Sequence, residues 1–257
     1  MKFSIITCTY NSEKWLKKSL ESVKKQSFLD WEHVFVDGFS SDGTISLIKN
    51  YQALFPEKVK LYQSPPRGIS NAMNEGVKNS TGDYLVHLHS DDSFFDDDAL
   101  RDVNVFLNNN ECDWIYGKIN VIDGAGNSQG IFPTKKIWQN NYHSWLGKYI
   151  LKFYNYIPHQ AVFIKKEVFD KFGGFDESLS SAMDPDLWLR IKNKTRWSFF
   201  DRIISNFCLH SESQTANLKM KEKNKINYRT VQKRYLNTLE LFLAEFIRWV
   251  ISFKSKI

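Results

Sequence analysis

Apolar and polar residues follow two different periods along the first 90 residues of the chain. Short β-rich apolar runs bounded by turn residues predict strands at residues 2–10, 31–37, 58–64 and 82–90. Between them, apolar positions recur at helical spacing and predict helices at residues 12–27, 44–55 and 69–80. Strand and helix therefore alternate in the order that builds a parallel sheet with covering helices, an α/β fold.

Each of these predicted strands ends in polar residues. In chain order the strand ends are Thr9-Tyr10-Asn11, Asp37, the residues just before Pro65-Pro66-Arg67-Gly68, and Asp91-Asp92. Ligands of open α/β sheets bind outside the carboxyl ends of the strands, so these residues should meet in one crevice. Arg67 offers a charge for phosphate, and two adjacent carboxylates suit a hard divalent cation, Mg²⁺ or Mn²⁺. A solvated turn before the next helix is the other interpretation of Asp91-Asp92.

The second half of the chain continues the α/β pattern. Residues 159–179 read as a strand, a helix and a turn, and the apolar helix in "SSAMDPDLWLRI" follows. Asp184 as N-cap with Pro185 at the first helical position is a good helix start. Such a start can also present the Asp184 carboxylate toward a cleft, where the helix N-terminus should lower its pKa. Asp186 should lie inside the first turn.

The last segment, residues 216–257, has neither Gly nor Pro and predicts a helical tail. Its apolar residues fall on one wide helix face: Leu239, Phe242, Leu243, Phe246, Trp249, Val250 and Phe253. Such a face is normally buried. The domain's own sheet, a second subunit (a homo-oligomer) and the inner surface of a membrane are the candidates to cover it.

Composition narrows the class of protein. With 257 residues, 42% hydrophobic and 25% charged, the chain has the make-up of a soluble globular protein. Three widely spaced cysteines and the lack of a signal-peptide or membrane-spanning run predict a cytoplasmic location. The net charge of +6 is concentrated between Lys219 and Arg234, where seven residues are basic and one is acidic. Nucleic acid, anionic lipid and solubility are open explanations of this basic segment.

Four stretches in this order carry a family resemblance: "SIITCTYN", "VFVDGFSSDGT", "RGISNAMNEGVKNSTGDYLVHLHSDD" and "GGFDESLSSAMDPDLWLRI". Together they resemble the family-2 glycosyltransferases with a GT-A fold, over about residues 1–210. The resemblance implies a mostly parallel sheet in two abutting halves. Residues 1–98 would bind the nucleotide sugar and residues 99–215 the acceptor. Beyond residue 210 the match fades, and residues 216–257 are the helical tail.

The resemblance also implies roles on the nucleotide side of the site. Thr9, Tyr10 and Asn11 match the segment that contacts base and ribose. Asp37 matches an acid that hydrogen-bonds the base, although Asp-Gly is also a common turn dipeptide. Arg67 lies where the family often places a base or phosphate contact.

The metal and catalytic motifs show departures from the family pattern. "HSDD" matches the DxD metal motif with His89 in place of the first acid, which assigns the metal to Asp92 and the ribose or metal shell to Asp91. In the motif usually written ED, Met183 replaces the Glu, and Asp184 stands at the position of the catalytic base. His210 matches a histidine near the diphosphate or metal. Ser213, Gln214 and Thr215 follow it and could help close the site over the donor.

These matches imply a metal-dependent, inverting transferase that moves a sugar from a nucleotide-diphosphate sugar to a hydroxyl. The family default is a uridine diphosphate donor and a glycan or lipid-linked glycan acceptor, as in bacterial cell-surface polysaccharide synthesis, with no nucleic-acid partner. A non-catalytic nucleotide-sugar-binding module and a nucleotidyltransferase are the alternatives. A nucleotidyltransferase normally begins with a Gly-rich, Arg-containing phosphate loop. The corresponding stretch here, "SIITCTYNSEKW", has no glycine, which disfavours that alternative.

Overall fold

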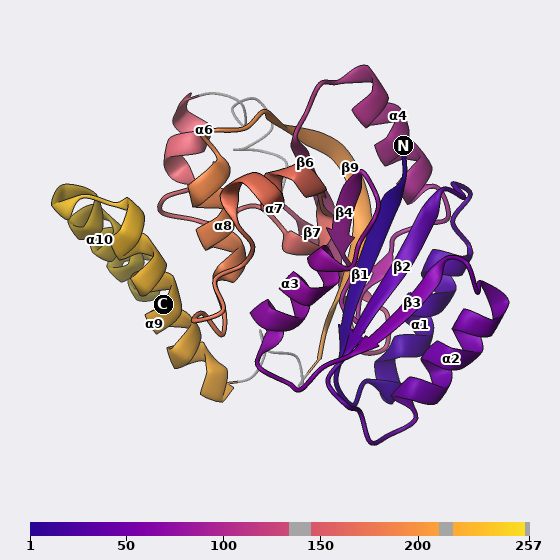
Figure 1. The fold of residues 1–257 in the computed structure, drawn as a ribbon. Coiled ribbons are helices and arrows are strands. Elements are labelled where there is room, and N and C mark those ends of the chain that lie inside the picture. Colours follow the sequence, from indigo (N-terminus) through magenta and orange to yellow (C-terminus); the bar gives the residue numbers. More distant parts are fainter. Residues whose placement is uncertain (134–144, 211–217, 255–257) are drawn as a thin grey trace.

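A nine-stranded sheet runs through the computed structural model, which describes residues 1–133, 145–210 and 218–254 (Figure 1). The strands are β1 (Phe3–Thr9), β2 (Trp31–Asp37), β3 (Val59–Gln63), β4 (Tyr84–His87), β5 (Ser93–Phe94), β6 (Trp114–Asp123), β7 (Ser128–Phe132), β8 (Val162–Lys165) and β9 (Trp197–Leu209). The helices are α1 (Glu13–Lys24), α2 (Thr44–Leu54), α3 (Ile69–Lys78), α4 (Ala99–Asn109), α6 (Trp145–Ile150), the short η1 (His159–Ala161), α7 (Lys166–Phe172), α8 (Met183–Ile191), α9 (Leu218–Tyr235) and α10 (Thr238–Lys254).

The strand order, β3-β2-β1-β4-β8-β6-β9-β5 with β7 beside β6, confirms the predicted parallel sheet in the first half. There β1 pairs in parallel with β2 and β4, and β2 with β3, because each helix supplies the crossover that parallel neighbours need. The second half is mixed: β8 is antiparallel to β4 and β6, whereas β6 and β9 are parallel. Since β5 pairs with β9, the two predicted halves share one sheet. The predicted boundary at residue 215 lies outside the described residues.

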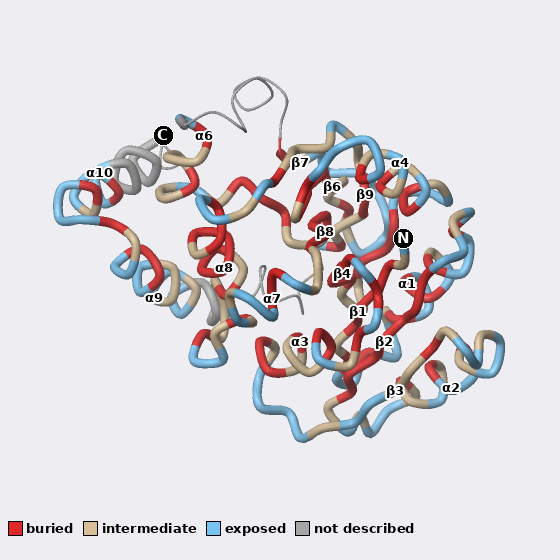
Figure 2. The backbone as a smooth tube through the Cα atoms, turned by 45° about the horizontal axis from the view of Figure 1, so that its top comes forward, coloured by how far each residue is buried: buried red, intermediate tan, exposed pale blue. Residues whose placement is uncertain are grey.

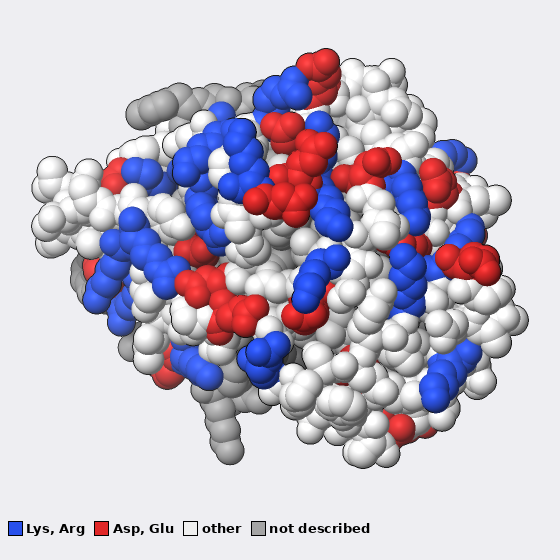
Figure 3. Space-filling view, in the orientation of Figure 1, with Lys and Arg blue, Asp and Glu red and all other residues white. Residues whose placement is uncertain are grey.

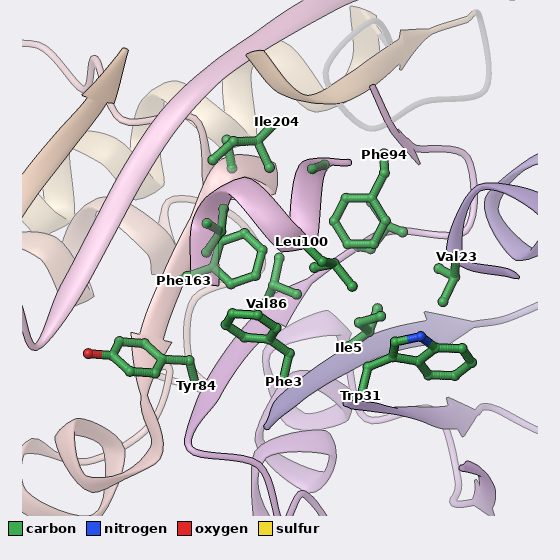
Figure 4. Packing of buried hydrophobic residues seen from close by; sticks show 14 of the residues in the cluster. Phe3, Ile5, Val23, Trp31, Tyr84, Val86, Phe94, Leu100, Phe163 and Ile204 are labelled. Carbon is green, nitrogen blue, oxygen red and sulfur yellow. The ribbon is translucent and has the colours of Figure 1, made fainter. Parts of the chain in front are cut away.

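Alternation along the buried strands divides the core into two layers. Ile5 and Val86 point to the layer that α1, α2 and α4 cover, together with Phe3 and Phe163 (Figure 4). The neighbouring positions along these strands, such as Ile6, face the layer that α3, α7 and α8 cover. The sheet is therefore shielded on both faces, which leaves the ends of its strands as the place where polar side chains can reach a ligand.

The tail is helical, as predicted, and folds into a hairpin of α9 and α10. Asn237 and Glu240 form a reciprocal cap: Asn237 N donates to Glu240 Oε2 (3.0 Å), and Glu240 N donates to Asn237 Oδ1 (2.9 Å). The described part of the apolar face does not pack on the sheet, since Leu239 and Phe242 are 82% and 75% exposed. Within the described residues, none of the helices has the length and apolar character required to span a bilayer.

Glu32 is a buried carboxylate that ties together the amino ends of the strands. It accepts hydrogen bonds from Ser4 Oγ (2.6 Å), Lys60 Nζ (2.8 Å) and Thr81 Oγ1 (2.8 Å). Burial alone would raise the pKa of Glu32, but these hydrogen bonds outweigh it and lower the pKa from 4.5 to about 2. The stabilisation is therefore complete above pH 4.5 and is lost as the pH falls toward 2.

We expect Glu32→Ala to lower the free energy of unfolding by about 3 kcal/mol at pH 7, because Ser4, Lys60 and Thr81 would lose the carboxylate that accepts their hydrogen bonds. Urea denaturation of both proteins at pH 7 and at pH 3 measures the effect, and the difference should shrink at the lower pH. The exposed Glu57→Ala is the matched control and should change stability by less than about 0.5 kcal/mol. An equal loss for both variants would show that the Glu32 network contributes nothing specific.

Candidate active site

A cleft of about 1680 Å³ opens at the carboxyl ends of β1 and β4, where the crevice was predicted. Four predicted site segments line it: Tyr10 and Asn11 after β1, Asp91 and Asp92 after β4, Asp184 at the start of α8, and His210 after β9. Its floor is partly apolar, with Ile69 and Met73 of α3 among the lining residues. The cleft therefore combines an apolar surface with carboxylates at two places, as a polar ligand with a ring would require.

Three of the predicted nucleotide-binding residues do not line the cleft. Thr9 and Asp37 are buried behind Tyr10, and Asp37 accepts hydrogen bonds from Thr9 Oγ1 (2.7 Å), Ser40 N (2.8 Å) and Ser40 Oγ (2.6 Å). In this structure Asp37 shapes the loop after β2, while its role toward a base stays a prediction. Arg67 is exposed on the loop before α3 and is not among the residues that line the cleft, although Ile69, two residues further on, is.

The loops around the cleft carry backbone strain. Asn11, Phe39 and Ala182 are non-glycine residues with φ of 49°, 61° and 62°. A left-handed conformation costs such residues on the order of 1 kcal/mol and tends to occur at functional sites. Asn11 and Ala182 line the cleft, and Phe39 follows Gly38 in the neighbouring loop.

The two adjacent carboxylates have different surroundings. Asp91 Oδ2 lies 3.0 Å from His210 Nε2, and the His210 ring stacks on Trp15 with 4.0 Å between ring centroids. Asp92 is buried, and its Oδ1 accepts a hydrogen bond from Cys208 N (3.0 Å). Burial and the neighbouring Asp91 charge raise the pKa of Asp92 well above its usual range, against the Cys208 amide and the Gln160 side chain. Asp91, Asp92 and His210 thus all line the cleft, and Asp91 and His210 are in contact there.

These residues fit a cation that a substrate helps to bind. Within residues 1–133, 145–210 and 218–254 no three His, Cys, Asp or Glu side chains form a complete metal site. Mg²⁺ and similar ions, however, are usually held by one or two carboxylates together with substrate phosphates. Asp92 Oδ2 is buried and has no hydrogen bond of standard geometry to the described residues, so one carboxylate oxygen remains without a partner that such an ion would supply. The roles of Asp92 and His210 as metal ligands stay predictions.

Asp184 lies in the first turn of α8, which corrects the predicted helix start. The helix begins at Met183, and Ala182 in the left-handed conformation precedes it, so Asp184 is not the N-cap. Asn155 Nδ2 donates to Asp184 Oδ2 (3.2 Å). Burial raises the pKa of Asp184 to about 6, although hydrogen bonds from its own backbone and from Asn155 oppose the shift. The predicted lowering by the helix N-terminus is therefore wrong, because the loss of hydration outweighs it.

Asp186, by contrast, is a structural residue of the fold. It is buried and contacts Arg190 Nη2 (2.9 Å), Arg234 Nη1 (3.0 Å) and the Tyr235 hydroxyl (3.1 Å). It does not line the cleft, and Asp184 does. The geometry thus agrees with the choice of Asp184 over Asp186 as the carboxylate that faces a substrate.

Sequence reasoning missed several residues that line the cleft. Trp15 lines the cleft and directly precedes Leu16, which belongs to the buried face of α1. The apolar spacing of this helix was the only feature of the sequence that singled Trp15 out. Asn155 and Gln160 precede β8 and carry no motif. No motif in the tail predicted a place in the cleft, yet α9 and α10 form one wall through Asn224, Lys225, Tyr228, Arg229 and Glu245. Ser213, Gln214 and Thr215 lie outside the described residues.

Known proteins share this sequence pattern. A PGL/p-HBAD biosynthesis glycosyltransferase of Mycobacterium bovis is 29% identical over 208 residues, which are 79% of this chain and 70% of that protein. The poly(ribitol-phosphate) beta-N-acetylglucosaminyltransferase TarS of Staphylococcus aureus is 31% identical over 134 residues, 51% of this chain but only 23% of TarS.

Solved structures share the fold. TarS residues 1–349 in complex with UDP-GlcNAc superpose with a TM-score of 0.69 at 22% identity, covering 92% of this chain and 72% of that chain. The mannosyltransferase PcManGT of Pyrobaculum calidifontis, in complex with GDP-Man and Mn²⁺, gives a TM-score of 0.68 at 17% identity. The match covers 95% of this chain and 68% of that chain. The sheet and its flanking helices are thus of the GT-A type. The profile of glycosyl transferase family 2 matches residues 4–173, more than half of the chain, and the chain therefore belongs to this family.

Proposed function

We propose that the chain transfers a sugar from a nucleotide-diphosphate sugar to an acceptor hydroxyl with inversion. The observation that carries the proposal is one cleft with two kinds of carboxylate. Asp91 lies 3.0 Å from His210 and beside Asp92, where a diphosphate and its cation would bind, and Asp184, on a different element, is half-buried with its pKa raised to about 6. Uridine diphosphate is the proposed nucleotide, as in the UDP-GlcNAc complex of TarS.

In the proposed reaction Asp184 accepts the proton of the acceptor hydroxyl. The acceptor oxygen forms a bond to the anomeric carbon while the bond from that carbon to the diphosphate breaks, and its electron pair stays on the diphosphate oxygen. A pKa near 6 leaves Asp184 mostly ionised at pH 7, and more basic than an ordinary aspartate. A single displacement of this kind inverts the configuration at the anomeric carbon.

Asp92 and His210 are the residues that would hold Mn²⁺ or Mg²⁺, which when bound neutralises the charge of a departing diphosphate. Tyr10 and Asn11 would contact the base and ribose, with Thr9 and Asp37 supporting their loop from behind. Asp91 would contact the ribose or the metal shell. Arg67 would need its loop to approach the nucleotide.

We propose a glycan or lipid-linked glycan as acceptor, on the cytoplasmic side of a membrane. The support is the names of two relatives: one is a PGL/p-HBAD biosynthesis glycosyltransferase, and the other, TarS, is a poly(ribitol-phosphate) beta-N-acetylglucosaminyltransferase. A thermal-shift screen of nucleotide sugars with Mn²⁺ tests the donor, because a ligand that binds only the folded state raises the melting temperature. Mass spectrometry of the donor then separates enzyme from binding module: a degenerate transferase would bind the nucleotide sugar without consuming it.

The hydrogen bond from Asn155 makes a further prediction about pH. It favours the ionised form of Asp184, so Asn155→Leu should raise the Asp184 pKa above about 6. The acid limb of the pH–rate profile should then move to higher pH, with the rate at pH 8 or above less affected than the rate at pH 6.

Initial rates between pH 5 and pH 9 measure the shift. Asn109→Leu, at the exposed end of α4, is the matched control and should leave the profile unchanged. A profile of Asn155→Leu that falls by the same factor at every pH would mean that Asn155 acts on something other than the protonation of Asp184.

A further inference from the structure

The α9–α10 hairpin is fixed to the body of the protein through its inner side. Arg234 Nη1 contacts Asp176 Oδ2 (2.6 Å) and Asp186 Oδ1 (3.0 Å), and Lys152 Nζ contacts Glu240 Oε1 (2.7 Å). Val231, Leu236 and Ala244 are buried on the same side. The hairpin is therefore not a loose extension, and the residues it turns outward are held at a defined place.

The outer side of α10 is apolar and exposed. Leu239, Phe242, Leu243 and Phe246 are 82%, 75%, 42% and 53% exposed, and they follow the i, i+3, i+4, i+7 spacing of one helix face. Figure 2 shows the described start of α10 with exposed positions recurring between buried ones. In the sequence the same spacing continues with Trp249, Val250 and Phe253. A stripe of this size normally marks an interaction site.

Charge favours an anionic lipid surface over a second copy of the chain. The preceding helix is strongly basic, with seven basic residues and one acidic residue between Lys219 and Arg234, and the sequence continues after α10 with Lys256, two residues beyond Lys254. Lys and Arg side chains gather over α9 on the face shown in Figure 3. Pairing two copies of the chain along α10 would bring two such basic segments together, and the segments would repel each other. Anionic headgroups would instead attract the exposed Lys223 and Lys233 of this segment, each contributing about 1 kcal/mol near the surface.

The length and polarity of α10 suit a helix that lies in the membrane interface. Its 17 residues extend about 25 Å, and Glu240, Glu245 and Arg248 interrupt its apolar character. Large apolar side chains on one face and polar ones on the other are typical of interfacial helices.

The hairpin also joins this surface to the cleft. Asn224, Lys225, Tyr228 and Arg229 of α9 line the cleft, as does Glu245 of α10, which lies between Phe242 and Phe246 in the sequence. Arg229 Nη2 and Glu245 Oε2 are 3.2 Å apart and connect the two helices at this wall. A surface that contacts the outer side of α10 is thus one helix away from the cleft.

We infer that the α9–α10 hairpin docks the protein on an anionic membrane and opens the cleft toward an acceptor carried by that membrane. This inference rests on the proposed glycosyl transfer and narrows the proposed acceptor to the membrane-carried alternative: an amphiphile whose polar head enters the cleft along α9 while its apolar chain stays in the bilayer. The cleft wall formed by Lys225, Tyr228 and Arg229 would contact the polar head.

Flotation with vesicles tests the inference on the full chain. We expect the wild type to float with vesicles that contain phosphatidylglycerol at low salt, and poorly with vesicles of phosphatidylcholine alone or at high salt. The double variant Leu239→Ser/Phe242→Ser should reduce the bound fraction by about 10-fold or more. The matched control Leu29→Ser/Leu54→Ser replaces two side chains that are 68% and 62% exposed elsewhere, and it should float like the wild type.

Two further measurements separate this inference from the proposed function. Both double variants should keep the wild-type melting temperature and its increase with a nucleotide sugar and Mn²⁺. If that increase is intact and the wild type ignores anionic vesicles, the docking inference is wrong and the transferase proposal stands. Light scattering during gel filtration gives a second result that would contradict the inference. If the wild type is a dimer that does not bind vesicles, and Leu239→Ser/Phe242→Ser is a monomer, the apolar face belongs to a contact with a second copy.

Discussion

Replacing Asp92 by asparagine should abolish detectable sugar transfer and remove the part of nucleotide-sugar binding that depends on a divalent cation. The amide keeps an oxygen that can accept the hydrogen bond from Cys208 N, so the turn after β4 should stay in place. What is lost is the carboxylate charge, including that at the buried oxygen Oδ2, which has no hydrogen bond of standard geometry to the described residues. Losing one group that stabilises charge at a reacting centre reduces turnover by about 10²–10³-fold, and losing the ion it holds reduces it further.

Titration calorimetry of a nucleotide sugar with and without Mn²⁺ measures the binding effect in both proteins. Asp97→Asn is the matched control, since Asp97 is an exposed carboxylate in the same acidic stretch. It should keep both turnover and the Mn²⁺ dependence. If the wild type binds the nucleotide sugar equally well in EDTA and in Mn²⁺, the assignment of Asp92 fails, whatever the variant does.

The first half of the fold was predictable because its information is local. Each strand of β1 to β4 is a short apolar run, and each helix between them shows its own period, so the order of the elements implies parallel pairing. The pairing of β5 with β9 is different. Ser93 and Phe94 give too short a segment for any period, and their neighbours Asn206 and Ser205 lie more than a hundred residues away. Only the folded chain shows this pairing.

The site was predictable to the extent that topology alone brings its residues together. Tyr10, Asn11, Asp91 and Asp92 follow strands that end at one edge of the sheet, and all four line the cleft. Burial within that edge could not be predicted: the hydroxyl and amide of Ser40 engage the Asp37 carboxylate and place it behind the cleft surface. The same strand-end argument that places the cleft therefore does not say which carboxylates face it.

The part of the cleft wall that the tail forms and the pKa of Asp184 both depend on contacts between segments that are distant in the sequence. Arg234 reaches Asp176 and Asp186, and this contact holds α9 against the start of α8, where its side chains join the cleft. Nothing in the basic sequence of α9 indicates that docking. Local sequence predicts a lowered pKa for a carboxylate in the first turn of a helix, whereas burial raises that of Asp184 to about 6.

Asp184→Asn should reduce turnover by about 10²-fold or more while nucleotide-sugar binding stays near the wild-type level, because only the proton acceptor is removed. The folded-state pKa of about 6 lies above the usual 3.8, so ionised Asp184 makes the folded state less stable as the pH rises through this window. A neutral amide avoids that cost. The melting temperature of Asp184→Asn at pH 8 should therefore equal or exceed that of the wild type.

Asp186→Asn is the informative contrast, two residues along the same helix. It weakens the contacts to Arg190, Arg234 and Tyr235, so it should lower the free energy of unfolding by about 3 kcal/mol. Stopped assays of product formation, run well below both melting temperatures, and thermal denaturation at pH 8 distinguish the two variants. A base at position 184 requires a large loss of rate with no loss of stability. If Asp184→Asn instead keeps its turnover and melts at a lower temperature, Asp184 supports the helix start and another group accepts the proton.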